Sequence, residues 1–452
     1  MKRSVLVWSC CASLLFSACG GQEGGDTGTP DGGGNLPSDG GGNEPNPSTI
    51  TVTGKVLAAS GAAATKVSIL IPGDGRREVS VDGAGAFSVS GVTPPYDLIV
   101  AEKERRSAIL YRGLTLKTLT LSLEEEDTES VTHRATVKGN LTGEDASPSS
   151  TTEVSFVSER GSGNGLRDIG GSYSLDVDWL GATPVTGTLY AFQYESSSSY
   201  SPPTRYLGFG QRDNVTLEEN ATLSAQDIAL SAVTNSNLGG SITVPDGYAL
   251  RLSSVSLAPT PATEVSLFSS FAPTSTFNYV VPQIPQATFS MQVFASEEGA
   301  SDPDNAASLL LFKRGLTAGV TNAAMVLHPA ARPAQPANEA KDVSLTTGFS
   351  WSPYASGVHR IQFQEDKSDN QTPYTVTILT RGTDTTLPDL SALGMALPAN
   401  TEFTWQVHGV GPVDSVDALV GLLEKGDPAR GGTEDFHTSL SETRTFTTAA
   451  TP

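Results

Sequence analysis

The chain of 452 residues is short of cysteine and histidine, and both shortages exclude kinds of site. Its three cysteines, Cys10, Cys11 and Cys19, all stand near the amino terminus. The rest of the chain therefore has no disulfide framework, thiolate metal site or cysteine nucleophile. None of the five histidines falls in an H-E-x-x-H or H-x-H pattern, so we predict no metal site and no cofactor.

Positive charge is also scarce. The chain has 28 Lys and Arg against 49 Asp and Glu, which gives a formal net charge of -21. Nucleic acids and anionic lipid surfaces both attract basic patches, so this balance argues against either as a partner. The sequence contains no G-x-S-x-G nucleophile elbow and no other catalytic constellation. We therefore expect a protein that is not an enzyme and has no catalytic residues.

Two histidines, His359 and His408, belong to neighbouring predicted strands. His359 is in phase with the apolar residues Ile361 and Phe363, whereas His408 falls between the apolar positions of its strand. Alternating side chains of a strand point to opposite faces. The two rings should therefore lie on opposite faces and should not share a metal ion.

The first residues have the layout of a secretory signal peptide. Lys2 and Arg3 are positive, residues 5–16 are mostly apolar but too short to span a bilayer, and Ser17 and Ala18 are small. A cysteine directly after them, Cys19, resembles the lipobox of bacterial lipoproteins. The resemblance implies removal of residues 1–18 and lipidation of Cys19, which would attach the chain to a membrane. The alternative is an ordinary signal peptide with a chance cysteine.

Residues 19–48 are dominated by Gly, Asp, Asn, Pro and Ser and contain one Leu. Such a segment cannot bury enough apolar surface to offset its ordering entropy, so we predict a disordered tether. Its root-mean-square span would be roughly 30 Å. Gly20 follows the cysteine where inner-membrane retention signals of lipoproteins place a charged residue. By resemblance, this favours the cell outer membrane, with the side that the protein faces left open.

From Ile50 onward, short strands of alternating apolar and polar residues are separated by Gly, Pro, Asn and Asp, which predicts an all-β chain of tandem β-sandwich domains. The same order of elements occurs three times, in residues 49–125, 131–232 and 236–330. A strand with an internal glycine opens each unit, an aromatic strand follows, and a long strand comes next. Their shared landmarks are the second strands at Val67, Val154 and Val265, and the aromatics Phe87, Tyr173 and Phe277.

Two of the units also contain similar strings, at residues 110–114 (LYRGL) and 311–316 (LFKRGL). In the first unit, residues 54–56, 67–69, 82–87 and 94–100 resemble a carboxypeptidase-regulatory-like domain of the transthyretin-like sandwich type. That fold includes hydroxyisourate hydrolases, whose chains end in Tyr-Arg-Gly-Ser. Here Leu114 replaces the Ser and residues 50–131 lack histidine, so we exclude this activity.

Residues 337–450 differ from the three units. Phe349 to Pro353, Leu397 to Val407 and Thr443 to Thr448 resemble strand B, the E–F corner with strand F, and strand G of a fibronectin type III domain. Between strands F and G lies a long insertion, residues 412–441. Its residues Val416, Leu419, Val420 and Leu423 recur at helical spacing and predict the chain's one convincing helix.

From these observations we predict a non-enzymatic envelope lipoprotein that acts in binding, adhesion or scaffolding at the cell surface. It would carry three transthyretin-like sandwiches and a fibronectin type III-like tip. The 412–441 insertion would contact an envelope protein, the alternative being a solvated insertion that packs on its own domain. The alternative is a glycan-binding or polysaccharide-binding lipoprotein that stacks sugars on Tyr194 and Tyr200. We expect Tyr190 and Phe192 in the second unit's own core, and residues 161–165 in a hairpin turn.

Overall fold

The structure is a computed structural model that describes residues 49–58, 63–64, 66–72, 77–123, 132–145, 147, 149–166, 171–198, 201–260, 263–355, 357–367, 372–424 and 433–452. Within these residues the chain is a set of tandem β-sandwiches with one α-helix and two 3-10 helices. This confirms the predicted all-β fold class. The lipidation site Cys19, the segment 19–48 and Tyr200 lie outside the described residues.

The first unit is a sandwich of a three-stranded and a four-stranded sheet. Its strands are β1 (Ile50–Leu57), β2 (Ser68–Ile71), β3 (Arg77–Ser80), β4 (Ala86–Val92), β5 (Tyr96–Glu102), β6 (Ser107–Leu114) and β7 (Thr118–Ser122). One sheet has the order β4-β1-β7, with β1 and β7 parallel, and the other has the order β3-β2-β5-β6. Apolar side chains that alternate along these strands fill the space between the two sheets.

The third unit repeats this arrangement strand for strand. Its strands are β17 (Asn235–Thr243), β18 (Tyr248–Thr260), β19 (Thr263–Ser270), β20 (Thr276–Pro282), β21 (Thr288–Glu297), β22 (Ser308–Leu316) and β23 (Ala323–Val326), with the 3-10 helix η1 (Pro303–Asn305) before β22. The sheet orders are β20-β17-β23 and β19-β18-β21-β22. The first and third units therefore share one topology.

The second unit uses the same pairings and adds two more. Its strands are β8 (Thr132–Thr142), β9 (Ser150–Val157), β10 (Gly161–Leu166), β11 (Ser172–Leu180), β12 (Val185–Ser196), β13 (Pro203–Leu217), β14 (Thr222–Leu223), β15 (Ile228–Ala229) and β16 (Ser231–Ala232). Because β10 also pairs with β11, the two sheets of the unit join into a single sheet. The pairing of β13 with β16 adds an edge strand, and this sheet has nine strands.

One physical contact explains the glycine and aromatic landmarks of all three units. The glycine of each opening strand stands directly opposite the aromatic residue of the fourth strand, in the pairs Gly54–Phe87, Gly139–Tyr173 and Gly240–Phe277. A Cβ added at Gly54 would lie 2.6 Å from Cζ of Phe87, and the corresponding distances at the other two pairs are 2.9 and 2.8 Å. The ring lies over the glycine, so no larger residue fits there.

Two local predictions were wrong. Val265 belongs to β19, the third strand of its unit, because β18 before it was missed. The pairing of β18 with its two neighbours shifts register at three points, so its apolar residues lose their alternation. Residues 161–165 form β10 and not a hairpin turn. Their glycines allow close approach to β11: a Cβ at Gly165 would lie 2.9 Å from Cβ of Leu175.

The last part of the chain forms a further sandwich. Its elements are β24 (Pro333–Gln335), β25 (Ala340–Val343), β26 (Phe349–Trp351), β27 (Val358–Glu365), β28 (Thr375–Thr380), β29 (Asp384–Thr385), η2 (Ser391–Leu393), β30 (Glu402–Gly411), α2 (Val416–Glu424), β31 (Phe436–Leu440) and β32 (Arg444–Thr448). One sheet is β24-β26-β29, and the other contains β28, β27, β30 and β32. The predicted helix is present at the predicted residues.

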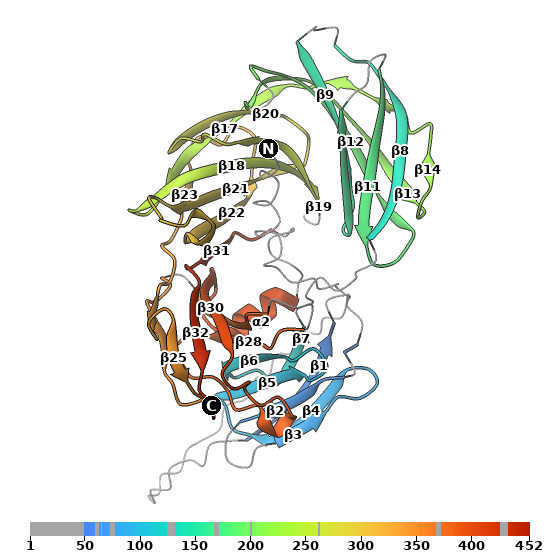
Figure 1. Ribbon diagram of the computed structural model, residues 1–452. Helices are drawn as coiled ribbons and strands as arrows, with labels where there is room; N and C mark the ends of the chain where they lie inside the picture. The colour runs from blue at the N-terminus through green and yellow to red at the C-terminus, as the bar shows by residue number, and fades with distance from the viewer. Residues whose placement is uncertain are drawn as a thin grey trace, which may run out of the picture.

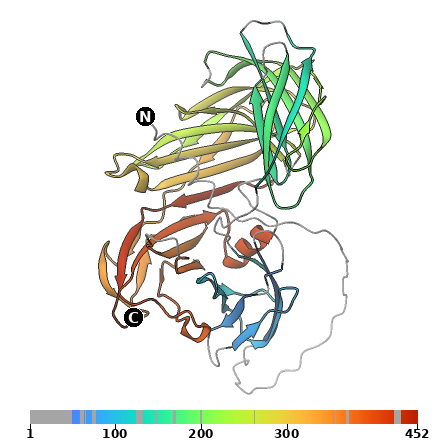
Figure 2. The same cartoon turned by 45° about the vertical axis from the view of Figure 1, so that its right-hand side comes forward.

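The last sandwich lies between the first and third units and is not the tip of the molecule. A single sheet of 14 strands runs from β19 of the third unit through β31, β30, β27 and β28 to β6 and β3 of the first unit. In Figures 1 and 2 the second unit forms one end of the molecule and the first unit the other. The prediction that the last sandwich forms the tip of the molecule was therefore wrong, because neighbouring units pair with this sheet on both sides.

Candidate functional site

Among the described residues, no group of three His, Cys, Asp or Glu side chains could hold a metal ion. No helix in the described part of the chain is long and apolar enough to cross a membrane. Gly409 of β30 stands opposite His359, and His408 stands opposite Arg360, so the two histidines lie on opposite faces as predicted.

The junctions between the units contain several partly buried polar contacts. At the first seam, defined as β6 and β7 with β28 and α2, β28 pairs with β6 in parallel from Ser107 to Tyr111. The guanidinium of Arg106 lies 2.7 Å from the buried carboxylate of Glu365 and over the ring of Tyr374. A charge-assisted pair of this kind fixes the register of two strands that are far apart in sequence.

Helix α2 completes the first seam. Its residues Val416, Leu419, Val420 and Leu423 are buried in the core of the first unit. A carboxylate of the helix, Asp417, accepts a hydrogen bond from a backbone amide at the end of β6. The apolar face of this helix packs against the first unit of the same chain. This face of the 412–441 insertion is therefore not available for the expected contact with an envelope protein.

The second seam, defined as β22 with β31 and β30, joins the third unit to the last sandwich. β31 pairs with β22 on one side and with β30 on the other, so the insertion bridges two sheets. Nζ of Lys313 lies 2.5 Å from a carboxylate oxygen of Asp435. Nε of the buried Arg314 lies 3.2 Å from Glu264, and its Nη1 donates to the backbone carbonyl of Glu434.

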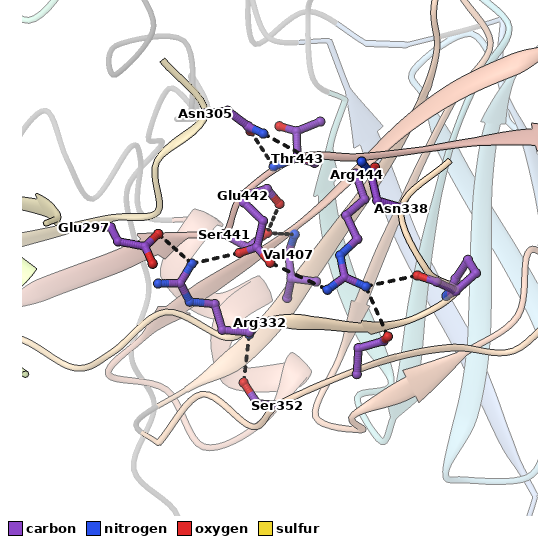
Figure 3. Close-up of polar contacts among 12 residues, drawn as sticks. Glu297, Asn305, Arg332, Asn338, Ser352, Val407, Ser441, Glu442, Thr443 and Arg444 are labelled. Carbon is purple, nitrogen blue, oxygen red and sulfur yellow. Dashed lines mark hydrogen bonds and ion pairs between the residues drawn. The ribbon is translucent and has the colours of Figure 1, made fainter. Parts of the chain in front are cut away.

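A polar network crosses the second seam at the linker between the two domains, as Figure 3 shows. Nη1 of Arg332 lies 3.0 Å from Glu297 of the third unit and 2.8 Å from Glu442 of the last sandwich. The side-chain amide of Asn305 both accepts from and donates to the backbone of Thr443. Asn305 thus joins the third unit to the last sandwich.

Buried histidines surround Tyr354 beside the second seam. The backbone N–H of Tyr354 donates to Nε2 of His359 over 2.9 Å, and its hydroxyl lies 2.6 Å from Nδ1 of His437. Burial lowers the pKa of His359 to about 4. Burial, and then the neighbouring His328, lower the pKa of His437 to about 4. Burial also holds the pKa of His408 well below its usual range.

The row of aromatics on β12 faces the third unit and not the second unit's own core. Tyr190 and Phe192 are buried in the apolar cluster of the third unit, whereas Leu189 and Ala191 fill the core of the second. The expected burial is confirmed, but the expected face is corrected, because alternate residues of one strand serve two different cores.

Tyr194, one of the two proposed sugar-stacking residues, lies half-buried at the same junction. Its ring is 6.0 Å from that of Tyr206, and its hydroxyl bonds to Glu153. Burial raises the pKa of Tyr194 to about 12. An exposed flat ring is the usual platform for a sugar, and the described structure does not offer one here.

The repeated strings LYRGL and LFKRGL mark the docking edges. They lie at the ends of β6 and β22, the two strands that pair with the last sandwich. The second unit lacks the string, and its corresponding strand β13 pairs with its own β16. The repeated string can be recognised in the sequence, although the repeat by itself does not indicate which strand pairs with it.

Comparison with known proteins does not assign the chain to a family. No family model matches the chain, and no curated protein matches it. Among solved structures, the Bacillus anthracis TIE protein is 12% identical and covers 62% of this chain with a TM-score of 0.15, while the chain covers 50% of it. The major pilin subunit BcpA of Bacillus cereus is 7% identical, with 62% and 99% covered and a TM-score of 0.14. Both TM-scores are too low to carry any role over to this chain.

Proposed function

We propose that the chain is a non-enzymatic lipoprotein of the outer membrane, which acts as a stiff scaffold for adhesion or binding at the cell surface. In this proposal Cys19 carries the lipid and residues 19–48 form the tether. Three transthyretin-like sandwiches and a fibronectin type III-like sandwich form the body. The order β24-β26-β29 beside β28-β27-β30-β32, and the shared topology of the first and third units, support these domain types.

The continuous 14-stranded sheet is the observation that carries the scaffold role. Tandem domains are usually joined by linkers and move relative to one another. Here backbone hydrogen bonds cross both seams, and α2 packs into the core of another unit. Bending at a seam would therefore break strand pairs and expose apolar surface.

The arrangement also gives the molecule two distinct ends. The first unit follows the proposed tether directly, and the second unit lies at the opposite end of the body. A membrane-attached chain would hold the second unit outermost. Its position makes the second unit the part that first meets a partner, which fits an adhesive or scaffolding protein.

Metabolic labelling with palmitate tests the anchor. Wild-type chain and a Cys10→Ser control should both incorporate label, whereas Cys19→Ser should not. Equal labelling of Cys19→Ser would overturn the lipid anchor. Protease treatment of intact cells tests the surface location separately. Digestion only after the outer membrane is permeabilised would contradict a surface role while leaving the anchor in place.

A further inference from the structure

A cleft lies where β6 of the first unit meets the small sheet of the last sandwich. Its cavity volume is about 310 Å³, and it is lined by Arg112 from β6 and by residues of β26 and β29 with their neighbours Gly348 and Thr386. Small-molecule sites commonly occur at domain interfaces and begin at about this volume. A single sugar ring fits a space of this size.

The arginine in this cleft lacks a partner among the described residues. Nε of Arg112 is buried without a hydrogen bond, and no ion pair in that part of the chain involves its guanidinium. An unsatisfied buried donor is destabilising, and more so when it belongs to a charged group. Arg112 as a whole is only partly buried and lines the cleft, so an acceptor bound there can pair with its guanidinium.

The same chain shows what an arginine at this strand position binds. Arg112 and Arg314 each precede the glycine of the repeated string, and those glycines, Gly113 and Gly315, have φ values of 72° and 66°. Arg314 contacts the carboxylate of Glu264 and a backbone carbonyl. Its counterpart Arg112 presents the same guanidinium to an open cleft, so a carboxylate is the matching acceptor.

The other lining groups identify the rest of the ligand. Thr386 and Ser350 offer hydroxyl groups, and the exposed Asp384 offers a carboxylate that accepts hydrogen bonds. A simple carboxylate would be repelled by Asp384. A ligand that carries both a carboxylate for Arg112 and hydroxyl donors for Asp384 satisfies both of these lining groups.

We propose that this cleft binds a sugar acid, such as a uronic acid unit, through its carboxylate at Arg112 and its hydroxyls at Asp384. This proposal rests only on the lining of the cleft and on Arg112, whose Nε is unpaired among the described residues, so it does not depend on the lipid anchor or on the scaffold role. It is also separate from Tyr194, which lies at the junction of the second and third units.

Calorimetric titration of the purified full chain with sodium glucuronate tests the site. Glucuronate should bind, while glucose and glucuronamide, which lack the carboxylate, should bind about tenfold to a hundredfold more weakly, the value of a hydrogen bond to a charged group. N-acetylalanine provides a carboxylate without sugar hydroxyls. Equal binding of N-acetylalanine would overturn the sugar part of the proposal.

Two variants locate the binding. Arg112→Ala should lose about tenfold or more in affinity, and Gly348→Val should also lose binding, because a Cβ at Gly348 enters open space beside the cleft. Arg134→Ala removes an exposed arginine of the second unit and should leave affinity unchanged. No heat from the wild-type chain at millimolar glucuronate, or full binding by both cleft variants, would overturn the proposal.

Discussion

Acidification to pH 5 should weaken the second seam through its buried histidines. His359 accepts a backbone hydrogen bond at Nε2, and Nδ1 of His437 can accept from the hydroxyl of Tyr354 only while the ring is neutral. Protonation removes both acceptors and places charge in a buried cluster. Because β31 carries His437 and pairs with both β22 and β30, the loss falls where the third unit joins the last sandwich.

The size of the effect follows from the pKa values. Burial lowers the pKa of both histidines from 6.5 to about 4 in the folded chain. The unfolded chain therefore binds more protons between these values, and stability is full above pH 6.5 and falls as the pH drops toward 4. From pH 7 to pH 5 the loss is about 2 kcal/mol for each histidine, or about 4 kcal/mol for the pair.

Urea unfolding at pH 7, 6 and 5 measures this loss. His437→Asn and His359→Gln keep an acceptor near the same position but cannot be protonated, so each should remove about 2 kcal/mol of the pH dependence. The control His133→Gln changes a histidine of the second unit, away from the seam, and should leave the dependence in place. Equal pH dependence in wild type and the double variant would refute the reasoning.

Three further substitutions test packing at named contacts, each by the free energy of unfolding. Leu419→Ala should cost about 2–5 kcal/mol because this helix residue is buried in the first unit, whereas Ala418→Ser on the exposed side should cost little. Gly54→Ala should destabilise the first unit, since its Cβ would meet Phe87, while Gly83→Ala has open space and should be tolerated. Arg314→Ala should cost about 3–5 kcal/mol because it leaves the carboxylate of Glu264 without its arginine, whereas the exposed Arg134→Ala should cost little.

The sequence was sufficient to predict features that arise within a few residues of each other. Alternation of apolar residues predicted most strands, and the spacing from Val416 to Leu423 predicted the helix. Local patterns failed where geometry departs from regular alternation. The register shifts in β18 concealed a strand, and the glycines of β10 resembled a turn although they serve close packing on β11.

The arrangement of the units could not be predicted from local patterns. Pairing of β6 with β28 joins residues more than 260 positions apart, such as Ser107 and Thr375, and alternation along a strand does not specify its neighbour. The two faces of β12 illustrate the same limit. Tyr190 and Leu189 are both apolar enough for a core, and only the position of the third unit decides which core each one enters.

Disulfide trapping across the second seam tests the central claim, that the last sandwich joins its neighbours through shared strands. Ser308 of β22 stands directly opposite Leu440 of β31. In a chain whose three native cysteines are replaced by serine, Ser308→Cys with Leu440→Cys should oxidise to a disulfide, found by mass spectrometry of non-reduced peptides. Ser308→Cys with Thr438→Cys, two residues out of register, should not. Failure of the first pair, or equal oxidation of both, would contradict the account.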